Sequence, residues 1–277
     1  MADQAVRTMK RWVKDAVQDR FLRAGMNLRR AASRDEVAAV LSLLRPVKTR
    51  FDLIRIGGAG DGGYLVPDDL DGIAACFSPG VDVTADFERD ILGRGIPCFL
   101  ADASVDAPPF SDPRLDFEKK FLGAWDDEQF TTLDRWVQRK RPAGGDDLLL
   151  QMDIEGHEVP VLLNVSEPVL RSFRMIVLEL HALPHWFDPF ALGVMQTLFQ
   201  RLTRFFHVVH AHPNNVEPAQ SCQGLRLPYF LEVTLLRKDR AVAEGPAGPF
   251  PHRLDVANVP SRPDLLLPAI LGGPNHR

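Results

Sequence analysis

The sequence is poor in cysteine and has no long hydrophobic run. Its three cysteines, Cys76, Cys98 and Cys222, lack the spacing of a metal-binding motif. So small and odd a number is typical of a reducing compartment, where buried thiols act as small apolar residues. No apolar stretch approaches the ~18 residues that a membrane-spanning helix needs. The first residues, MADQAVRTMKRWVKDAVQDRF, also lack the apolar core of a secretion signal. These absences predict a cytoplasmic protein.

An excess of positive charge and internal repeats are absent too. The net charge is -4, which argues against the basic field of a nucleic-acid-binding protein. The chain has 277 residues, of which 45% are hydrophobic, so it can bury the core of one large α/β domain or two small ones. We therefore expect no nucleic-acid partner.

The first thirty residues predict an amphipathic helix with a basic polar face. Its apolar face would hold Val6, Met9, Val13, Val17 and Phe21. Such a helix could lie on the anionic inner face of a membrane, or pack against the domain or a second copy of the chain. A second helix is predicted over 34–44, ending before Pro46. We assign residues 1–50 to an N-terminal helical extension.

Glycines are concentrated in residues 54–64, IRIGGAGDGGY. Gly58, Gly60 and Gly63 formally match GxGxxG, but a dinucleotide-binding turn needs a helix immediately afterwards. Residues 65–69 indicate a short strand and a turn instead. The segment predicts a glycine-rich hairpin or lid near a ligand, or a purely structural hairpin. The match leaves an NAD(P)-dependent oxidoreductase of Rossmann type as an alternative function.

From residue 73 onward, predicted strands alternate with predicted helices. Strands are predicted over 74–78, 98–101, 148–153, 175–180, 207–211 and 229–236, and helices over 85–93 and 189–204. Thr84 is the predicted N-cap of the first helix, with Glu88 as a capping-box partner one residue beyond the ideal spacing. This alternation predicts a doubly wound, mostly parallel sheet in a domain spanning 51–240. The last strand follows a loop and is expected to run antiparallel.

The composition changes after Asp239. Residues 241–277 hold seven prolines and little periodicity, which predicts an extended tail on the surface. Its apolar residues are expected to dock part of it, namely Leu265, Leu266, Leu267, Ile270 and Leu271.

An acid cluster follows the apolar strand in LLLQMDIEGHE, residues 148–158. Open α/β sheets bind ligands outside the carboxyl ends of their strands, where carboxylates can act as bases, metal ligands or anchors for cations. Asp153 is therefore predicted to be functional. Glu155 and Glu158 either join it or simply suit the dipole at a helix N-terminus.

A glycine turn and an acid 22 residues later predict a nucleoside site. Gly80 would let a ligand approach the backbone, and Asp102 would accept both ribose hydroxyls. The spacing alone fits NAD and S-adenosylmethionine equally. Asp82, Asp86 and Glu88 make the turn acidic, which suits a cationic sulfonium better than a pyrophosphate. The predicted cofactor contacts are Ser78, Pro79, Gly80, Glu88, Asp102 and Ala103.

Five segments together resemble the FkbM-type methyltransferases. They are CFSPGVDVTADFE (76–88), LADAS (100–104), TTLDRWV (131–137), QMDIEGHE (151–158) and LELH (178–181). The resemblance runs from about residue 54 to 240, and DIEG is its most specific element. It implies a Rossmann-like class I methyltransferase domain with a seven-stranded sheet, S-adenosylmethionine as donor and a carbohydrate hydroxyl as acceptor, as in polysaccharide and glycolipid assembly.

Methyl transfer to a hydroxyl needs close alignment of donor and acceptor and removal of the hydroxyl proton by a base or a metal. Asp153 and His181 are the predicted catalytic residues. Asp153 and Glu179 also resemble the acid pair of metal-dependent O-methyltransferases, which suits Mg²⁺ or Mn²⁺. His210 is predicted as a further metal ligand, and His181 and His212 come from neighbouring strand ends.

The predicted function is thus an S-adenosylmethionine-dependent O-methyltransferase acting on a sugar hydroxyl of a glycan. Besides the oxidoreductase, a non-catalytic glycan-binding subunit of a polysaccharide assembly complex remains an alternative. Of these three, only the methyltransferase should be stabilised by S-adenosylmethionine and consume it.

Overall fold

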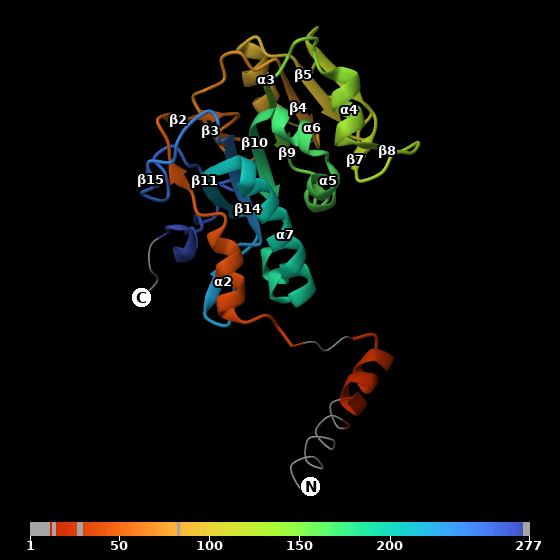
Figure 1. Ribbon diagram of the computed structural model, residues 1–277, viewed down its shortest axis with the longest axis vertical. Helices are drawn as coiled ribbons and strands as arrows, with labels where there is room; N and C mark the ends of the chain where they lie inside the picture. Colours follow the sequence, from red (N-terminus) through yellow and green to blue (C-terminus); the bar gives the residue numbers. More distant parts are fainter. Residues whose placement is uncertain (1–11, 13–14, 27–29, 82–83, 274–277) are drawn as a thin grey trace.

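The computed structural model describes residues 12, 15–26, 30–81 and 84–273, and its architecture is α/β (Figure 1). Seven strands form the main sheet in the order β11-β14-β10-β9-β4-β5-β6. These strands are β4 (Ala75–Pro79), β5 (Cys98–Ala101), β6 (Leu115–Glu118), β9 (Leu148–Met152), β10 (Phe173–Leu180), β11 (Phe206–Asn214) and β14 (Phe230–Arg237). The strands from β6 to β10 pair in parallel, whereas β14 runs antiparallel to both β10 and β11. The predicted mostly parallel α/β sheet is confirmed.

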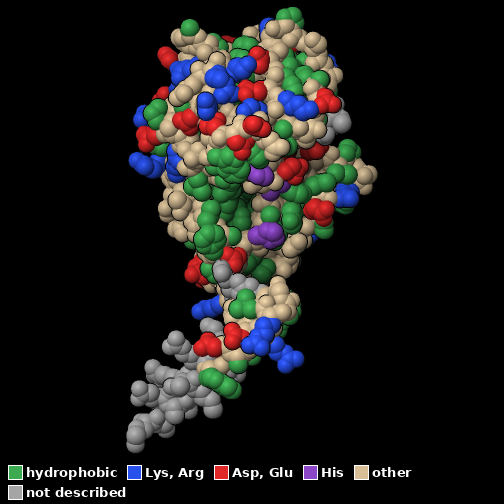
Figure 2. All heavy atoms as spheres, turned by 90° about the vertical axis from the view of Figure 1, so that its right-hand side faces the viewer, with side chains coloured by type: hydrophobic (Ala, Val, Ile, Leu, Met, Phe, Trp, Pro, Cys, Tyr) green, Lys and Arg blue, Asp and Glu red, His purple; other side chains and the backbone are tan. Residues whose placement is uncertain are grey.

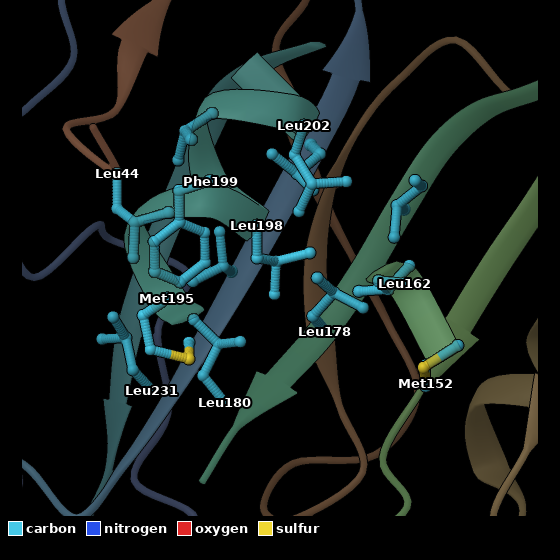
Figure 3. Packing of buried hydrophobic residues seen from close by; sticks show 14 of the residues in the cluster. Leu44, Met152, Leu162, Leu178, Leu180, Met195, Leu198, Phe199, Leu202 and Leu231 are labelled. Carbon is cyan, nitrogen blue, oxygen red and sulfur yellow. The ribbon is translucent and has the colours of Figure 1, made fainter. Parts of the chain in front are cut away.

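Both faces of the sheet are covered, because the side chains of its strands alternate between two cores. Leu148 and Leu150 belong to one core and Leu149 to the other. The first core lies under α2 (Arg34–Ser42), α4 (Leu133–Lys140), α5 (Glu158–Asn164), α6 (Glu167–Ser172) and α7 (Pro189–Phe205). Figure 3 shows side chains of α7, including Leu198, packed against Leu178 of β10. The continuous burial of these strands explains their uninterrupted apolar sequences.

A helix and a hairpin cover the second face. The helix is α3 (Asp86–Gly93), and the hairpin pairs β2 (Leu53–Ile56) with β3 (Tyr64–Pro67) in antiparallel register. The Thr234 hydroxyl of β14 donates to the carbonyl of Leu65 at 2.7 Å, which attaches the hairpin to the sheet. The predicted glycine-rich hairpin is confirmed. Because a strand follows its glycines, the dinucleotide-binding reading loses its structural support.

The helix start follows the local sequence at α2 and at α7 but departs from it at α3. Ser33 and Glu36 form a complete capping box on α2, and the Asp188 side chain accepts two backbone N–H groups at the start of α7. At α3 the N-cap is Ala85 and makes no side-chain hydrogen bond, so the predicted Thr84 cap is wrong. Glu88 is turned toward the sheet, where it meets Ser78, and is therefore unavailable for a capping box.

A buried arginine joins the sheet to the loop before β4. Arg174, only 4% exposed, donates to Asp147 Oδ2 at 2.7 and 3.0 Å and to the carbonyls of Asp69 and Asp71 at 2.8 and 2.7 Å. Its charge is thus paired and its donors are used, the condition under which a buried ion is tolerated.

The tail returns to the N-terminal part of the chain and to the main sheet. β15 (Gly245–Pro246) pairs antiparallel with β1 (Val47–Lys48), and Leu267 and Leu271 are buried, which confirms the predicted docking. The structure also contains two further strand pairs, β7 (Phe121–Gly123) with β8 (Phe130–Thr132) and β12 (Gln220–Cys222) with β13 (Leu225–Leu227). Two 3-10 helices are η1 (Leu183–Phe187) and η2 (Ala269–Leu271).

Residues 15–23 form a helix that lies outside the body of the molecule (Figures 1 and 2). Its described neighbours Trp12 and Met26, and its own Val17 and Leu22, are exposed. Much of the predicted apolar face, including Val6, Met9 and Val13, lies outside the described residues. Among the helices that are described, none is long and apolar enough to cross a membrane.

Candidate active site

A cavity of about 500 Å³ lies at the carboxyl ends of β4, β5, β9 and β10. The strand order reverses between β4 and β9, since β5 and β6 continue to one side of β4 while β10 continues beyond β9. Such a reversal opens a crevice where α/β sheets bind ligands. The sheet topology therefore places the cavity where the sequence predicted a site.

The cavity is strongly acidic. Its lining, as far as the structure describes it, contains eight carboxyl side chains, Asp61, Asp86, Glu88, Asp102, Asp153, Glu155, Glu179 and Glu217. Among the described lining residues there is no lysine or arginine, and His181 is the one of them that can carry a positive charge. An environment of this kind favours cations and neutral polar ligands over phosphates and carboxylates.

Gly80 lies in the turn after β4 and lines the cavity. Its φ is +88°, and a Cβ atom built on it would overlap the carbonyl oxygen of Asp153. The absence of a side chain is thus required by the backbone that follows β9, and not only by the approach of a ligand as predicted.

Asp102 follows β5 and is held before any ligand arrives. Its Oδ2 accepts the backbone N–H of Val81 at 2.8 Å, and its Oδ1 accepts the N–H and the hydroxyl of Ser104 at 2.7 and 2.6 Å. A carboxylate has about four acceptor positions. Three are occupied, so Asp102 can accept one ribose hydroxyl through Oδ2, whereas the sequence predicted two.

The structure separates the six predicted cofactor contacts into two groups. Gly80, Glu88 and Asp102 line the cavity, whereas Ser78, Pro79 and Ala103 do not. Ser78 is fully buried, and its hydroxyl is hydrogen-bonded to Glu88 and Gln151. It therefore supports two lining side chains from beneath. Burial raises the pKa of the Glu88 carboxyl, against the opposing effect of its hydrogen bond with Ser78.

The DIEG segment forms a tight turn organised by Glu158. Glu155 and Gly156 have φ values of +56° and +94°, in the left-handed region. Glu158 is 1% exposed, and its Oε1 accepts the N–H groups of Ile154 and Gly156 at 2.8 and 3.3 Å. Of the two glutamates that the sequence left open, Glu158 shapes the turn, while the side chain of Glu155 is 89% exposed at the rim of the cavity.

His181, which follows β10, stands among four carboxylates. Its Nε2 lies 3.5 Å from Glu155 Oε2 and 3.7 Å from both Asp153 Oδ1 and Glu179 Oε2, and its Nδ1 lies 3.4 Å from Glu158 Oε1. Burial lowers the pKa of His181, but contact with Glu158 and the charges of Asp153 and Glu155 outweigh it, so the pKa is raised overall. The imidazole is the natural counter-charge of the cluster.

Two carboxyl groups beside His181 have raised pKa values. Burial, opposed by the charge of His181 and assisted by Glu158 and Glu155, raises the pKa of Asp153 from 3.8 to about 7. Burial and the charge of Asp153 raise the pKa of Glu179 well above its usual value. Asp153 Oδ1 is buried and has no hydrogen-bond partner within the described part of the chain. The side chain as a whole is 30% exposed and lines the cavity, so Asp153 can meet a ligand there.

Of the three predicted metal ligands, the structure brings Asp153 and Glu179 together, but with His181 in place of His210. Asp153, Glu179 and His181 each offer a ligand atom, and these atoms lie within 4.8 Å of one another. His210 does not belong to this group, because its side chain is buried under the tail with Nε2 2.9 Å from Asp255 Oδ1. His212 is likewise enclosed by Glu232 and Asp264. The sequence could predict the alternation of side chains along β11, but it could not predict that the tail covers this strand.

Several lining residues were not predicted. Gln151 interrupts the apolar run of β9, and this polar residue inside a buried strand was the signal that could have revealed it. Asp61 comes from the glycine loop between β2 and β3, and Asn214 from the end of β11. Tyr64 and Phe230 add aromatic faces, with the Phe230 ring 5.0 Å from the His181 ring, edge to face.

Comparison with known proteins identifies a family over part of the chain. The family model described as the Methyltransferase FkbM domain matches residues 112–213. The matched segment includes β9, the DIEG turn, β10 and His181, and therefore the acid cluster at the cavity. No curated protein matches the chain. The resemblance predicted from the sequence is thus confirmed over residues 112–213, where the model of the FkbM methyltransferase domain matches.

Proposed function

We propose that this protein is an S-adenosylmethionine-dependent O-methyltransferase that acts on a sugar hydroxyl of a glycan, polysaccharide or glycolipid. The family match supports methyl transfer. The observation that carries the finer proposal is the unpartnered Oδ1 of Asp153, beside His181, in a cavity without lysine or arginine among its lining residues.

The donor side suits a cationic nucleoside. Glu88 and Asp102 line it, and a positively charged sulfonium and amino group would be attracted there, while a pyrophosphate would be repelled. S-adenosylmethionine, when bound, supplies an activated methyl group. Asp102 would accept a ribose hydroxyl, and the Gly80 turn would bring backbone close to the nucleoside.

The acceptor side is suited to proton removal. A general base works best when its pKa is near the working pH, and the pKa of Asp153 is raised to about 7. We assign the Asp153 carboxylate as the group that takes the hydroxyl proton. His181 stays beside it, holds a positive charge and stabilises the Asp153 carboxylate before the proton arrives. Glu158 orients His181 from the far side.

A sugar ring fits the rest of the lining. Sugars present hydroxyl groups and weakly polar C–H faces, so they bind to polar side chains and aromatic rings together. Asn214 and Gln151 supply amides, and Tyr64 and Phe230 supply rings. The acidic lining favours a neutral or amino sugar over a uronic acid or a sugar phosphate at the reacting position.

A divalent cation is the second chemistry that the cluster could support. Asp153, Glu179 and His181 would hold it, and carboxylate and imidazole ligands together suit Mn²⁺ better than Ca²⁺. Its contribution would be to acidify the acceptor hydroxyl. Activity that EDTA leaves unchanged would exclude this role and leave Asp153 as the base.

The first test is donor binding. S-adenosylmethionine at 100 times its dissociation constant should stabilise the protein by about 2.7 kcal/mol, measured by thermal denaturation, and NADH should have no effect. No stabilisation by S-adenosylmethionine or S-adenosylhomocysteine at millimolar concentration would refute the proposal. Glycan binding without donor consumption would instead favour a non-catalytic glycan-binding subunit.

The second test concerns the N-terminal helix, for which we propose peripheral contact with a membrane surface or a second copy of the chain. Anionic vesicles should retain the full chain and release a variant without residues 1–26. Sedimentation of the two forms would reveal self-association. Equal behaviour of both forms in both assays would remove the proposal.

A further inference from the structure

The segment of the tail from residue 255 to 264, here called the strap, crosses the end of β11 and meets the glycine loop, residues 57–63. In Figure 1 the blue tail lies beside the orange β2–β3 hairpin. The strap contacts β11 through Asp255 on His210 and Asp264 on His212, and it contacts the residue after the strand through the Val259 N–H on Asn215. Segments nearly two hundred residues apart in the chain therefore meet at one side of the cavity.

Asn258 is the point where the strap reaches the glycine loop. It is 6% exposed, and its Nδ2 donates to Asp61 Oδ1 at 3.0 Å and to Glu232 Oε1 at 2.6 Å. An amide nitrogen has two protons, so both are used and the amide plane is fixed. The backbone oxygen of Asn258 also lies next to Gly60, where a Cβ atom would be 3.6 Å away.

Asp61 connects this contact to the acid cluster. The Asn214 amide donates from Nδ2 to Asp61 Oδ1 at 3.3 Å and to Glu179 Oε1 at 2.8 Å. Asp61 Oδ1 is thus the acceptor shared by two buried amides, one from the strap and one from β11. Glu179 lies 3.7 Å from His181, so the chain from Asn258 ends at the proposed catalytic residues.

The same strap fixes a second wall of the cavity. The Asn215 amide donates to the carbonyls of Val259, Arg262 and Pro263 at 3.1, 3.3 and 3.2 Å. The Arg262 guanidinium donates in return to the carbonyl of Val216, which lines the cavity. Buried amides with all protons used hold a backbone in one position.

We propose that Asn258 is a positioning residue, and that the strap holds the glycine loop and Asp61 against the acceptor side of the cavity. Asn258 itself does not line the cavity, so it acts through Asp61. The donor side, built on Gly80 and Asp102, has no contact with Asn258 among the described interactions. Loss of Asn258 should therefore weaken acceptor binding while donor affinity stays unchanged.

The test compares Asn258→Ala with Asp264→Asn, a control that weakens the strap at His212 without touching Asp61. Hydrogen exchange of residues 57–63, followed by mass spectrometry, should be about tenfold faster in Asn258→Ala and unchanged in the control. The acceptor KM should rise about tenfold in Asn258→Ala alone. The dissociation constant of the donor should stay the same in both variants. Asn258→Asp, which places a third carboxylate against Asp61 and Glu232, should exceed Asn258→Ala in both measurements.

The kinetic part rests on the proposed function, whereas the exchange part does not. Suppose that exchange is faster in Asn258→Ala but neither the native protein nor any variant transfers a methyl group. The strap proposal would then stand, and the proposed function would be refuted. Equal exchange in Asn258→Ala and Asp264→Asn would overturn the strap proposal. So would a KM that rises in both variants in proportion to their loss of melting temperature, since that would mark a purely structural role.

Discussion

Replacement of Asp153 by asparagine should stabilise this protein at neutral pH while it abolishes methyl transfer. The pKa of Asp153 is raised from 3.8 to about 7, mainly by burial, so the native state holds this proton more tightly than the unfolded chain does. The associated stability is present below about pH 4 and is lost as the pH rises through about 7. Asparagine has the same shape and never ionises.

The size of the effect follows from the pKa. A rise from 3.8 to about 7 corresponds to about 4 kcal/mol, at about 1.4 kcal/mol per unit. The side chain is 30% exposed, and solvent screening reduces the effect, so we expect Asp153→Asn to gain about 2 to 4 kcal/mol at about pH 8. The gain should shrink to less than about 1 kcal/mol near pH 4.

The assay is urea denaturation of both proteins between about pH 4 and pH 8, with EDTA present so that no cation occupies the cluster. Glu155→Gln is the matched control, because this carboxylate is 89% exposed and its removal should change stability little at any pH. A stability difference between Asp153→Asn and the native protein that is independent of pH would refute the reasoning. So would a variant that is less stable at pH 8 than the native protein.

Three further changes test separate parts of the structure. Gly80→Ala should lose about 2 to 5 kcal/mol in urea denaturation, from left-handed strain and overlap with the Asp153 carbonyl, and an unchanged stability would contradict that overlap. Arg174→Met should lower the free energy of unfolding by about 3 to 5 kcal/mol, because it leaves the half-buried Asp147 without this partner. A loss below about 1 kcal/mol would argue against a stabilising role for the Arg174 contacts. Asp102→Asn should weaken binding of S-adenosylmethionine about tenfold in calorimetry, since an amide nitrogen cannot accept the N–H groups that hold the side chain, and equal affinity would remove Asp102 from the site.

Local patterns in the sequence were sufficient for most of the sheet. Strands buried on both faces appear as short apolar runs, so β4, β5, β9 and β10 could be predicted close to their observed bounds. Asp153 and Asp102 follow such runs, and the carboxyl ends of neighbouring parallel strands meet at one edge. Their placement at the cavity therefore needed only the strand ends.

Contacts between distant segments could not be predicted in the same way. His210 and His181 both follow or end apolar runs, but the strap covers His210 with Asp255, a partner 45 positions later in the chain. Thr84 has the residue type of a helix cap, yet the packing of Glu88 against Ser78 sets where α3 begins. In each case a tertiary contact, absent from any local window, decides between alternatives of similar local energy.

The contact between Gly80 and the Asp153 carbonyl joins the turn after β4 to the turn after β9. The first turn belongs to the proposed donor half of the cavity and the second to the acceptor half. A displacement of either turn is transmitted directly to the other, because no side chain intervenes to absorb it. Binding in the two halves is therefore expected to be thermodynamically linked, and any factor by which donor changes the affinity for acceptor must apply equally in reverse. Gly80 thus makes the coupling between donor and acceptor binding a measurable property of a single backbone contact.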